Sequence, residues 1–480
     1  MLSHLVALGV LLTSSAVIAN YDPTWESIDS RPLPPWFDDS KIGIFLHWGV
    51  YAVPGRGEWF WSNWKGGNSY DVDFMKKFYP PDFTYADFAR DFRAEFFNPA
   101  EWAEIFSQSG ARYVVLTSKH HEGYTMWPSN YTYNWNAMDV GPKRDLLGEL
   151  AAKVRAKNLK FGTYYSLFEW FNPIYLKDKN NKFETNEFVR NKMLPELKEM
   201  IMKYKPEVIW SDGDWEAKDS YFTSQEFLAW LYNESPVKDT VVTNDRWGQG
   251  TGCTHGGYFS CQDRYNPGTL QQHKWENAMT LDRSSWGYRR TASLSDYLTI
   301  GELLKTLAST ISCGGNLLVN IGPTAYGKIP PIGEERLRQM GKWLQINGEA
   351  IYSSKPWVFQ NDTLNPDVWY TTKSDDPDCT VYAIVLKWPG ENTLRIRSPA
   401  VSSQTAVEMI GYSGQLKWTV EEDTRDLVIE FPNAAEVSKW AWVLRIKRLM
   451  NGCTPPPTAH RIHWANERSY FLQKMNIFTD

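Results

Sequence analysis

A short apolar run that breaks into two carboxylates is the part of the chain best suited to chemistry. Residues 208–210 read Val-Ile-Trp, which is typical of a buried strand, and Asp212 and Asp214 follow on either side of a glycine. A carboxylate just past a buried parallel strand lies where barrel enzymes place their reacting groups. Trp215 comes next and offers a flat apolar face on which a sugar ring can pack. The segment therefore indicates a glycosidase nucleophile, with Asp212 as the candidate.

Asp212 also has a purely structural interpretation. Aspartate is favoured as the N-cap of a helix that follows a strand, because its side chain accepts the free N–H groups of the first turn. Hydrolysis of a glycoside with retention needs two carboxyl groups, one to attack the anomeric carbon and one to protonate the leaving oxygen. Other groups in the chain must therefore decide between the two interpretations.

Polar and aromatic residues follow several other predicted strands. Three of the eight histidines, His47, His120 and His121, come at the ends of two such strands. One histidine at a strand end is usually a satisfied structural group, but three near the same face of a barrel favour a binding or catalytic site. Further candidates near predicted strand ends are Glu58, Trp59, Tyr165 and Arg246.

Apolar segments that read as buried strands alternate with segments of helical spacing. This alternation predicts a parallel sheet covered by helices, and its length favours a (β/α) barrel of the TIM type over an open doubly wound sheet. No Gly-x-Gly-x-x-Gly follows a strand, which also argues against a dinucleotide-binding fold. The predicted strands are residues 42–47, 113–120, 160–165, 208–210, 240–245 and 316–321, and the predicted helices are residues 99–109, 146–157, 187–205 and 296–312.

Beyond the predicted barrel, the apolar pattern changes to a period of two with turns between the segments. This pattern predicts an antiparallel β-sandwich, which would pack on the barrel rather than hold the reacting groups. The alternating segments are residues 368–372, 380–386, 393–397, 427–431 and 440–446. We therefore predict a catalytic barrel over residues 20–352, a sandwich over 353–450 and a poorly ordered extension over 451–480.

The N-terminus has the pattern of a secretory signal peptide. An apolar run covers residues 5–12, and small residues precede a predicted cleavage after Ala19, so that residues 1–19 are removed. The alternative is a membrane anchor, but the run is too short to span a bilayer comfortably. Three Asn-x-Ser/Thr sequons fit the secretory route, at Asn130, Asn233 and Asn361. We expect no membrane contact after cleavage.

Composition narrows the class of partner. Aromatic residues make up 15% of the chain, including 24 Trp and 25 Tyr, which fits sugar binding. A net charge of -5 and a pI near 6.0 give no reason to expect nucleic acid as a partner.

Among the five cysteines, Cys253 and Cys261 are close enough in sequence for a small loop-closing disulfide. The odd number leaves at least one thiol free or paired between chains.

As a set, the strand-end motifs resemble the α-L-fucosidases of glycoside hydrolase family 29, in the animal lysosomal or secreted form. The resemblance extends from about Trp25 to Ile446. The motifs that carry it are residues 45–49 (FLHWG), 118–123 (SKHHEG), 210–215 (WSDGDW), 244–248 (NDRWG), 273–276 (HKWE), 285–289 (SWGYR) and 316–323 (NLLVNIGP).

The resemblance implies retaining hydrolysis of terminal α-linked L-fucose from glycans, with no metal or cofactor. It implies that Asp212 is the nucleophile. It also implies a set of substrate-binding residues, namely His47, Glu58, Trp59, His120, His121, Tyr165, Trp210, Arg246 and Trp286. Family members are often tetramers, so a homo-oligomer is an open expectation, as are the linkage preference and the choice between lysosome and secretion.

The position of the acid/base varies within the family, and two residues compete for it here. Asp263 follows the predicted disulfide loop, which could hold a short side chain in place. Glu276 has the chemically commoner side chain for this role, because the pKa of glutamate starts higher. We favour Asp263 and keep Glu276 as the alternative, which would then serve as a hydrogen-bonding or structural carboxylate.

Two other functions are compatible with parts of the pattern. A metal hydrolase could use the histidines and Asp212, but adjacent histidines such as His120 and His121 should point to opposite faces of a strand. A non-catalytic glycan-binding protein could keep the barrel without turnover.

Two positions depart from the family pattern. Asp214 stands where glutamate is frequent. Cys313 stands where a small apolar residue is expected, and we interpret it as a buried thiol rather than a ligand.

Overall fold

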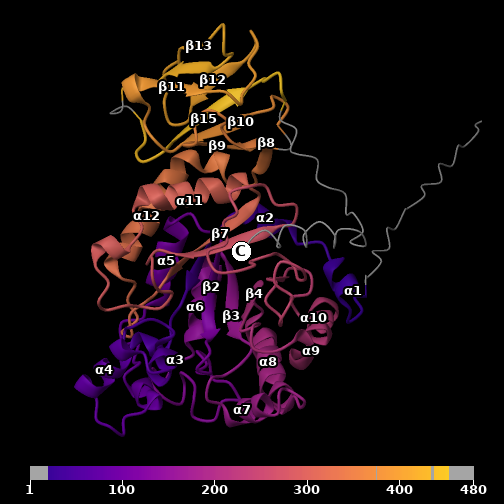
Figure 1. The fold of residues 1–480 in the computed structure, drawn as a ribbon, viewed down its shortest axis with the longest axis vertical. Helices are drawn as coiled ribbons and strands as arrows, with labels where there is room; N and C mark the ends of the chain where they lie inside the picture. The colour runs from indigo at the N-terminus through magenta and orange to yellow at the C-terminus, as the bar shows by residue number, and fades with distance from the viewer. Residues whose placement is uncertain (1–19, 374–375, 434–436, 453–480) are drawn as a thin grey trace, which may run out of the picture.

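The computed structural model describes residues 20–373, 376–433 and 437–452, which form a larger α/β region and a smaller all-β region (Figure 1). The predicted signal peptide and most of the predicted extension lie outside the described residues. The fold class agrees with the prediction, since a parallel, barrel-like sheet is followed by antiparallel sheets.

The α/β region is built on a seven-stranded parallel sheet with the order β5-β4-β3-β2-β1-β7-β6. All six strands predicted from the sequence are present, although β5 is much shorter than expected. Strand β6 was missed. The strands are β1 (Ile42–Leu46), β2 (Tyr113–Lys119), β3 (Lys160–Ser166), β4 (Val208–Asp212), β5 (Val242–Thr243), β6 (Trp275–Thr280) and β7 (Gly315–Ile321).

A short segment brings the two edges of this sheet together. The N–H of Tyr258 donates to the carbonyl of Thr243 in β5, and Phe259 forms a parallel bridge with Trp275 in β6. Residues 258–259 thus occupy the place of an eighth strand between β5 and β6. The chain that leaves this segment arrives directly at the face where the strands end.

Side chains alternate between the two faces of the strands. Tyr113, Val115 and Tyr164 belong to a core cluster inside the sheet, whereas Val114 and Tyr165 pack in the cluster between the sheet and its helices. Because successive residues of a strand point to opposite faces, this alternation fixes which side chains face the interior.

Helices surround the sheet (Figure 1). The helix predicted over residues 187–205 contains a π-helical turn, Val189–Met193, near its start. The helix predicted over 296–312 begins later, at a capping box of Thr299 and Glu302. The α-helices of this region are α1 (Trp25–Asp29), α2 (Pro35–Ser40), α3 (Phe60–Lys65), α4 (Ser69–Phe78), α5 (Pro99–Gln108), α6 (Leu146–Ala156), α7 (Pro173–Asn180), α8 (Leu194–Tyr204), α9 (Asp219–Phe222), α10 (Ser224–Asn233), α11 (Ile300–Ser312) and α12 (Pro331–Asn347).

The C-terminal region contains two antiparallel sheets, a five-stranded one of order β12-β15-β10-β9-β8 and a three-stranded one of order β11-β14-β13. They pack on the outer side of α11 and α12, away from the strand ends of the barrel (Figure 1). The indole of Trp343 in α12 donates to the carbonyl of Ala441 across this junction. The strands are β8 (Lys355–Asn361), β9 (Val368–Thr372), β10 (Val381–Val385), β11 (Thr393–Ile396), β12 (Ala406–Met409), β13 (Trp418–Val420), β14 (Leu427–Glu430) and β15 (Trp442–Lys447).

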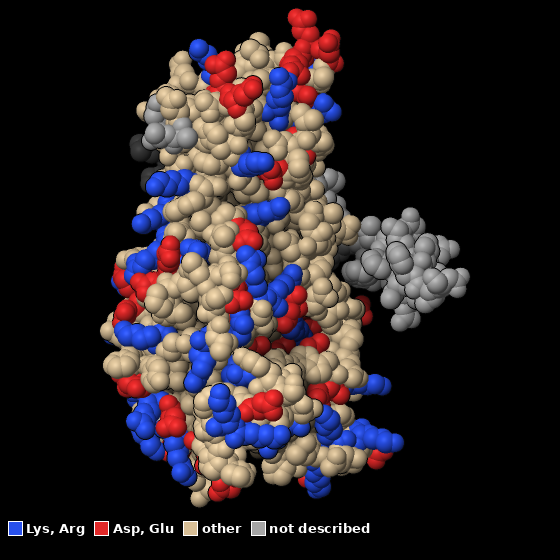
Figure 2. Space-filling model, turned by 60° about the vertical axis from the view of Figure 1, so that its left-hand side comes forward, with Lys and Arg blue, Asp and Glu red and all other residues tan. Residues whose placement is uncertain are grey.

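Charged side chains of both signs are interspersed on the face shown in Figure 2. This mixture agrees with the small net charge of -5. Within the described residues, no helix is long and apolar enough to cross a membrane.

Candidate active site

A pocket of about 410 Å³ opens at the carboxyl ends of the parallel strands. This is the face at which barrel enzymes carry their chemistry. Most of the residues selected from the sequence line it, together with several that were not selected. The lining residues are Phe45, His47, Glu58, Trp59, His120, Tyr164, Trp210, Asp212, Asp214, Trp215, Arg246, Cys261, Gln262, Asp263 and Trp286.

Asp212 is the last residue of β4 and lies in the wall of the pocket, 8% exposed. Its Oδ1 accepts from Nη1 of Arg246 at 3.0 Å, and its Oδ2 accepts from the hydroxyl of Tyr164 at 2.7 Å. Nε2 of His121 lies 3.6 Å from Oδ2. A helix N-cap would instead accept backbone N–H groups of the following turn. The surroundings of Asp212 are those of a carboxylate held rigidly toward the cavity.

Arg246 connects the two carboxylates that the sequence favours for the reaction. Besides Asp212, its guanidinium binds Asp263, with Nη2 at 2.9 Å from Oδ1. The same guanidinium lies over the ring of Trp210, 4.6 Å from the centroid. A planar guanidinium that binds two carboxylates at once fixes their relative position.

Asp263 lies at the open side of the pocket, with 48% of its side chain exposed. Its second oxygen, Oδ2, accepts from the indole N–H of Trp286 at 3.1 Å. The carboxyl group is therefore both oriented and accessible, as a group that exchanges protons with substrate and water must be.

Glu276 occupies a different environment. It lies on β6 and is completely buried, and its carboxylate accepts from the hydroxyl of Tyr113 at 2.5 Å and from the indole of Trp210 at 3.0 Å. Glu276 does not line the pocket, whereas Trp210, whose indole it binds, does. Burial raises the pKa of Glu276 to about 7. This position fits an internal hydrogen-bonding carboxylate better than a proton donor to substrate.

The buried Glu276 predicts a pH-dependent difference in stability. Its folded-state pKa lies above its unfolded value near 4.3, so folding favours the protonated form, and the stability it contributes is lost as pH rises from about 4.3 through 7. Glutamine is isosteric and stays neutral. Glu276→Gln should therefore gain stability relative to the parent between pH 4.5 and 8, by at most about 3 kcal/mol. Thermal unfolding of the variant and the parent at pH 4.5 and pH 8 measures this gain. A difference in stability between the two proteins that is the same at both pH values would contradict the prediction.

The histidines gather at the base of the pocket. Burial lowers the pKa of His47 and of His121 well below the usual value, so both rings are neutral. Nδ1 of His47 hydrogen-bonds Oδ1 of Asn320 at 2.7 Å, and Nδ1 of His121 hydrogen-bonds the hydroxyl of Ser166 at 2.7 Å. Each of these two rings is oriented through one nitrogen.

The expectation that His120 and His121 point to opposite faces was wrong. Their ring centroids lie 4.2 Å apart. Strand β2 ends at Lys119, so neither histidine follows the alternation of a strand. His120 lines the pocket, while His121 lies behind it against Asp212.

Glu58 is buried beside the pocket and held by three donors. Its Oε2 accepts from the backbone N–H of Trp286 at 3.1 Å, from that of Gly287 at 2.7 Å and from the hydroxyl of Ser285 at 3.0 Å. This set of contacts links the loop after β1 to the loop after β6, which carries Trp286, although β7 lies between these two strands in the sheet. Both side chains line the pocket.

The selection of Tyr165 as a pocket residue was wrong, because its side chain points away from the cavity. Its hydroxyl donates to Glu196 of α8 at 2.8 Å, within a buried group of charges that includes Lys119 and Lys192. Tyr164, the preceding residue of β3, faces the interior and binds Asp212. The alternation of the strand was the signal that could have separated the two.

Asp214, to which the sequence assigned no role in the reaction, also lines the pocket. Burial and, to a smaller extent, the negative charge of Asp212 raise the pKa of its carboxyl to about 6. Gly213, between them, has a φ of 93°, and a Cβ there would lie 2.6 Å from a ring carbon of Phe168. Glycine therefore allows the sharp turn that brings both aspartates to the cavity.

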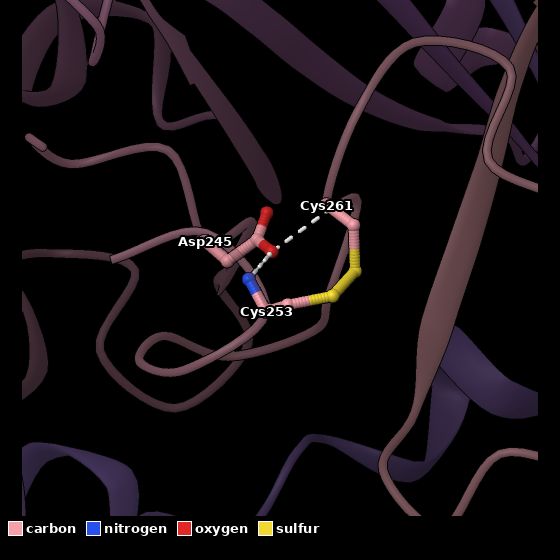
Figure 3. A group of neighbouring side chains, drawn as sticks. All are labelled: Asp245, Cys253 and Cys261. Atoms are coloured by element: carbon pink, nitrogen blue, oxygen red, sulfur yellow. Dashed lines mark hydrogen bonds between the residues drawn. A yellow bond between two sulfur atoms is a disulfide. The ribbon is translucent and has the colours of Figure 1, made fainter. Parts of the chain in front are cut away.

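A disulfide joins Cys253 and Cys261 next to the pocket, and a buried carboxylate holds its two ends (Figure 3). Oδ2 of Asp245 accepts from the N–H of Cys253 at 2.7 Å and from that of Cys261 at 3.0 Å. Its Oδ1 accepts the N–H and the hydroxyl of Ser260, and this hydroxyl in turn accepts from Nε of Arg246. The sequence did not single out Asp245, which fixes the start of the segment leading to Asp263.

Asp245 and the two sulfurs are also the one His/Cys/Asp/Glu group among the described residues that is close enough to hold a metal ion. Both sulfurs are already bonded to each other, so this group offers no pair of thiolates. The remaining described thiol, that of Cys313, is buried, which raises its pKa to about 12.

The three sequon asparagines differ in accessibility. Asn130 is exposed. The amide of Asn233 donates to the carbonyl of Tyr21, and that of Asn361 donates to two backbone carbonyls, so both are tied to the fold. Asn130 is the best placed of the three to carry a glycan.

Comparison with known proteins gives a consistent assignment. The family model described as Alpha-L-fucosidase matches residues 10–349, and the one described as Alpha-L-fucosidase C-terminal domain matches residues 360–447. The alpha-L-fucosidase of Branchiostoma floridae is 57% identical over 454 residues, which cover 92% of this chain and 100% of the relative. The plasma alpha-L-fucosidase of Homo sapiens is 54% identical over 437 residues, which cover 90% and 93%.

Solved structures extend the similarity to the fold. The α-fucosidase of Thermotoga maritima in complex with fucose has a TM-score of 0.77 and 32% identity, and the match covers 89% of this chain and 100% of that one. The same enzyme in complex with a mechanism-based inhibitor has a TM-score of 0.78 and 31% identity, with the same coverage.

Proposed function

The chain belongs to the α-L-fucosidase family, and we propose that it is a retaining exo-glycosidase that removes terminal α-linked L-fucose from fucosylated glycans. The observation that carries this proposal is the pair of carboxylates, Asp212 and Asp263, held by one guanidinium in the wall of a pocket. Retention requires two carboxyl groups about 5–5.5 Å apart. Both aspartates bind the same Arg246, which supports this spacing.

In the first step, Asp212 attacks the anomeric carbon of fucose from the side opposite the leaving oxygen. The bond between that carbon and the leaving oxygen breaks, and Asp263 gives its proton to the oxygen as the aglycone departs. The product is a fucosyl ester on Asp212. The hydroxyl of Tyr164 and the guanidinium of Arg246 hold the attacking carboxylate in line before the reaction.

In the second step, Asp263 is a carboxylate and takes a proton from water. The water oxygen bonds to the anomeric carbon while the ester bond to Asp212 breaks, so the original configuration returns and both groups are restored. Because Asp263 is half exposed, water can reach it without opening the pocket.

Recognition of the sugar is assigned to the buried end of the pocket. Neutral His47, together with His120, Glu58 and Arg246, supplies donors and acceptors for hydroxyl groups, and each of the four side chains is less than a tenth exposed. Polar groups already oriented by the protein discriminate well against a sugar that lacks a matching hydroxyl. Trp286 and Phe45 offer an apolar surface for the methyl group at C5.

The proposal also places the enzyme in the secretory pathway, in the lysosome or outside the cell. The names of its relatives include plasma and tissue forms. A panel of fucosylated oligosaccharides with different linkages, assayed across pH, would separate the two locations, because an acidic optimum favours the lysosome.

The test of the function is the anomer first released from an aryl α-L-fucoside. Proton NMR recorded during early hydrolysis should show α-L-fucose, followed by slow mutarotation to the equilibrium mixture. Initial β-L-fucose would exclude a fucosyl-enzyme, and no release at all would favour the non-catalytic glycan-binding alternative. Activity that disappears with EDTA would instead support a metal-dependent hydrolase.

A further inference from the structure

Two tryptophans at the mouth of the pocket leave much of their surface to solvent. Trp59 is 37% exposed and Trp215 is 43% exposed, whereas Trp210 and Trp286 in the same pocket are nearly buried. Large apolar surface exposed at the rim of a binding cavity is typical of a surface that a ligand covers. Trp215 is the more exposed of the two, and the fucose contacts assigned above do not use it.

Trp215 is held in place despite its exposure. Its ring meets that of His121 edge to face at 5.4 Å and that of Phe168 edge to face at 5.6 Å. The ring of Trp59 lies beside it at 6.0 Å, inclined by 33°. The side-chain amide of Gln249 donates to the backbone carbonyl of Trp215 at 2.8 Å. A side chain fixed in this way loses little conformational freedom when a ligand packs on it.

The gradient of exposure along the pocket separates two regions. The buried end holds Asp212 and the groups that fit one sugar, and the open end holds Asp263 and Trp215. The acid must reach the glycosidic oxygen, so the group that leaves with this oxygen has to lie on the open side of Asp263. The exposed indole and the leaving group therefore share the mouth of the pocket.

We propose that Trp215 forms the subsite for the sugar to which fucose is attached, by stacking its exposed face on the C–H face of a pyranose ring. The inference rests on the proposed function and adds to it the residue that holds the sugar next to fucose. Gln262 and Asp263 line the same mouth and supply polar partners for the hydroxyl groups at the edge of that ring.

The first test compares leaving groups in Trp215→Ala. The probes are α-L-fucosyl fluoride, whose leaving group has no ring, and two disaccharides, α-L-fucosyl-(1→2)-galactose and α-L-fucosyl-(1→6)-N-acetylglucosamine. For the better disaccharide, kcat/KM should fall about tenfold, as expected for loss of one stacking contact. The value for the fluoride should change less than twofold, and Trp215→Phe should retain part of the disaccharide activity.

The second test measures binding without turnover. In an Asp212→Gly background, Trp215→Ala should weaken calorimetric binding of the better disaccharide about tenfold and leave the affinity for free fucose unchanged. This readout does not depend on proton donation by Asp263. Tyr326→Ala, which removes a 58% exposed aromatic residue outside the pocket, is the matched control and should alter neither affinity.

The outcomes separate this inference from the proposed function. Equal losses on fluoride and disaccharide would mean that Trp215 acts through His121 on the nucleophile, and would overturn the subsite. Unchanged disaccharide binding would overturn it as well. A parent enzyme that hydrolyses none of the three probes would contradict the proposed function itself.

Discussion

Asp212→Gly should lower kcat for an aryl α-L-fucoside by about 10⁴-fold while the protein remains folded. The variant removes the atom that bonds to the anomeric carbon but leaves Arg246 paired with Asp263. Circular dichroism and thermal unfolding should therefore stay close to those of the parent. A variant that unfolds would indicate that Asp212 is a structural residue. A folded variant that keeps more than a tenth of the activity would exclude Asp212 as the nucleophile.

Azide gives this variant a diagnostic product. The space left by the Asp212 side chain lets azide attack the anomeric carbon from the nucleophile's side, so the product should be β-L-fucosyl azide, with inverted configuration.

Removal of Asp212 also removes a negative charge beside Asp214, whose pKa is raised in part by that charge. The pKa of Asp214 should therefore fall in the variant.

Asp263→Ala should have the second largest effect, and its size should depend on the leaving group. General acid catalysis contributes about 10²–10⁴-fold, so hydrolysis of a fucosyl disaccharide should slow by that factor. A 2,4-dinitrophenyl fucoside needs no protonation and should form the fucosyl-enzyme readily. Its turnover should then be limited by the second step, in which Asp263 serves as the base.

Azide again identifies the step that is impaired. It attacks the fucosyl-enzyme without needing a base, so it should accelerate turnover by Asp263→Ala and yield α-L-fucosyl azide, the anomer opposite to that from Asp212→Gly. Glu276→Gln is the matched control, since it should retain activity within a few-fold and form no azide adduct. Rescue of Glu276→Ala but not of Asp263→Ala would reverse the assignment.

Four of the strands that the sequence predicted, β1, β2, β4 and β7, each contain a run of at least three apolar residues. Residues 42–46 and 315–321 are buried along their whole length, and a parallel strand covered on both sides needs such a run. Strand β6, Trp275–Thr280, was missed because Glu276 and Asn277 interrupt its apolar pattern. Both polar side chains hydrogen-bond inside the fold to partners distant in sequence, which no local pattern reveals.

The pocket residues were predictable where they follow a strand end. Asp212, His47, His120 and Arg246 were selected on this basis and line the cavity. The choice of Tyr165 failed because two tyrosines stand side by side, and only the register of the strand decides which faces inward.

Contacts that depend on the path of a long loop could not be predicted. Asp245 receives four hydrogen bonds from residues 253–261, a segment with little regular structure. The closeness of Asp263 to Arg246 follows from that loop and from the bridge of Phe259 to β6. Sequence favoured Asp263 through the disulfide alone, without the carboxylate that orients the disulfide loop.

The most direct test of the account is to trap the sugar on the enzyme. A 2-deoxy-2-fluoro-L-fucosyl fluoride should form the fucosyl ester and slow its hydrolysis, because fluorine destabilises the positively charged transition states of both steps. Digestion and mass spectrometry should then place the added fluorofucosyl group on the peptide that contains residues 208–215, at Asp212. A stoichiometric label on Asp263, Glu276 or any other residue would contradict the assignment of the nucleophile and the mechanism built on it.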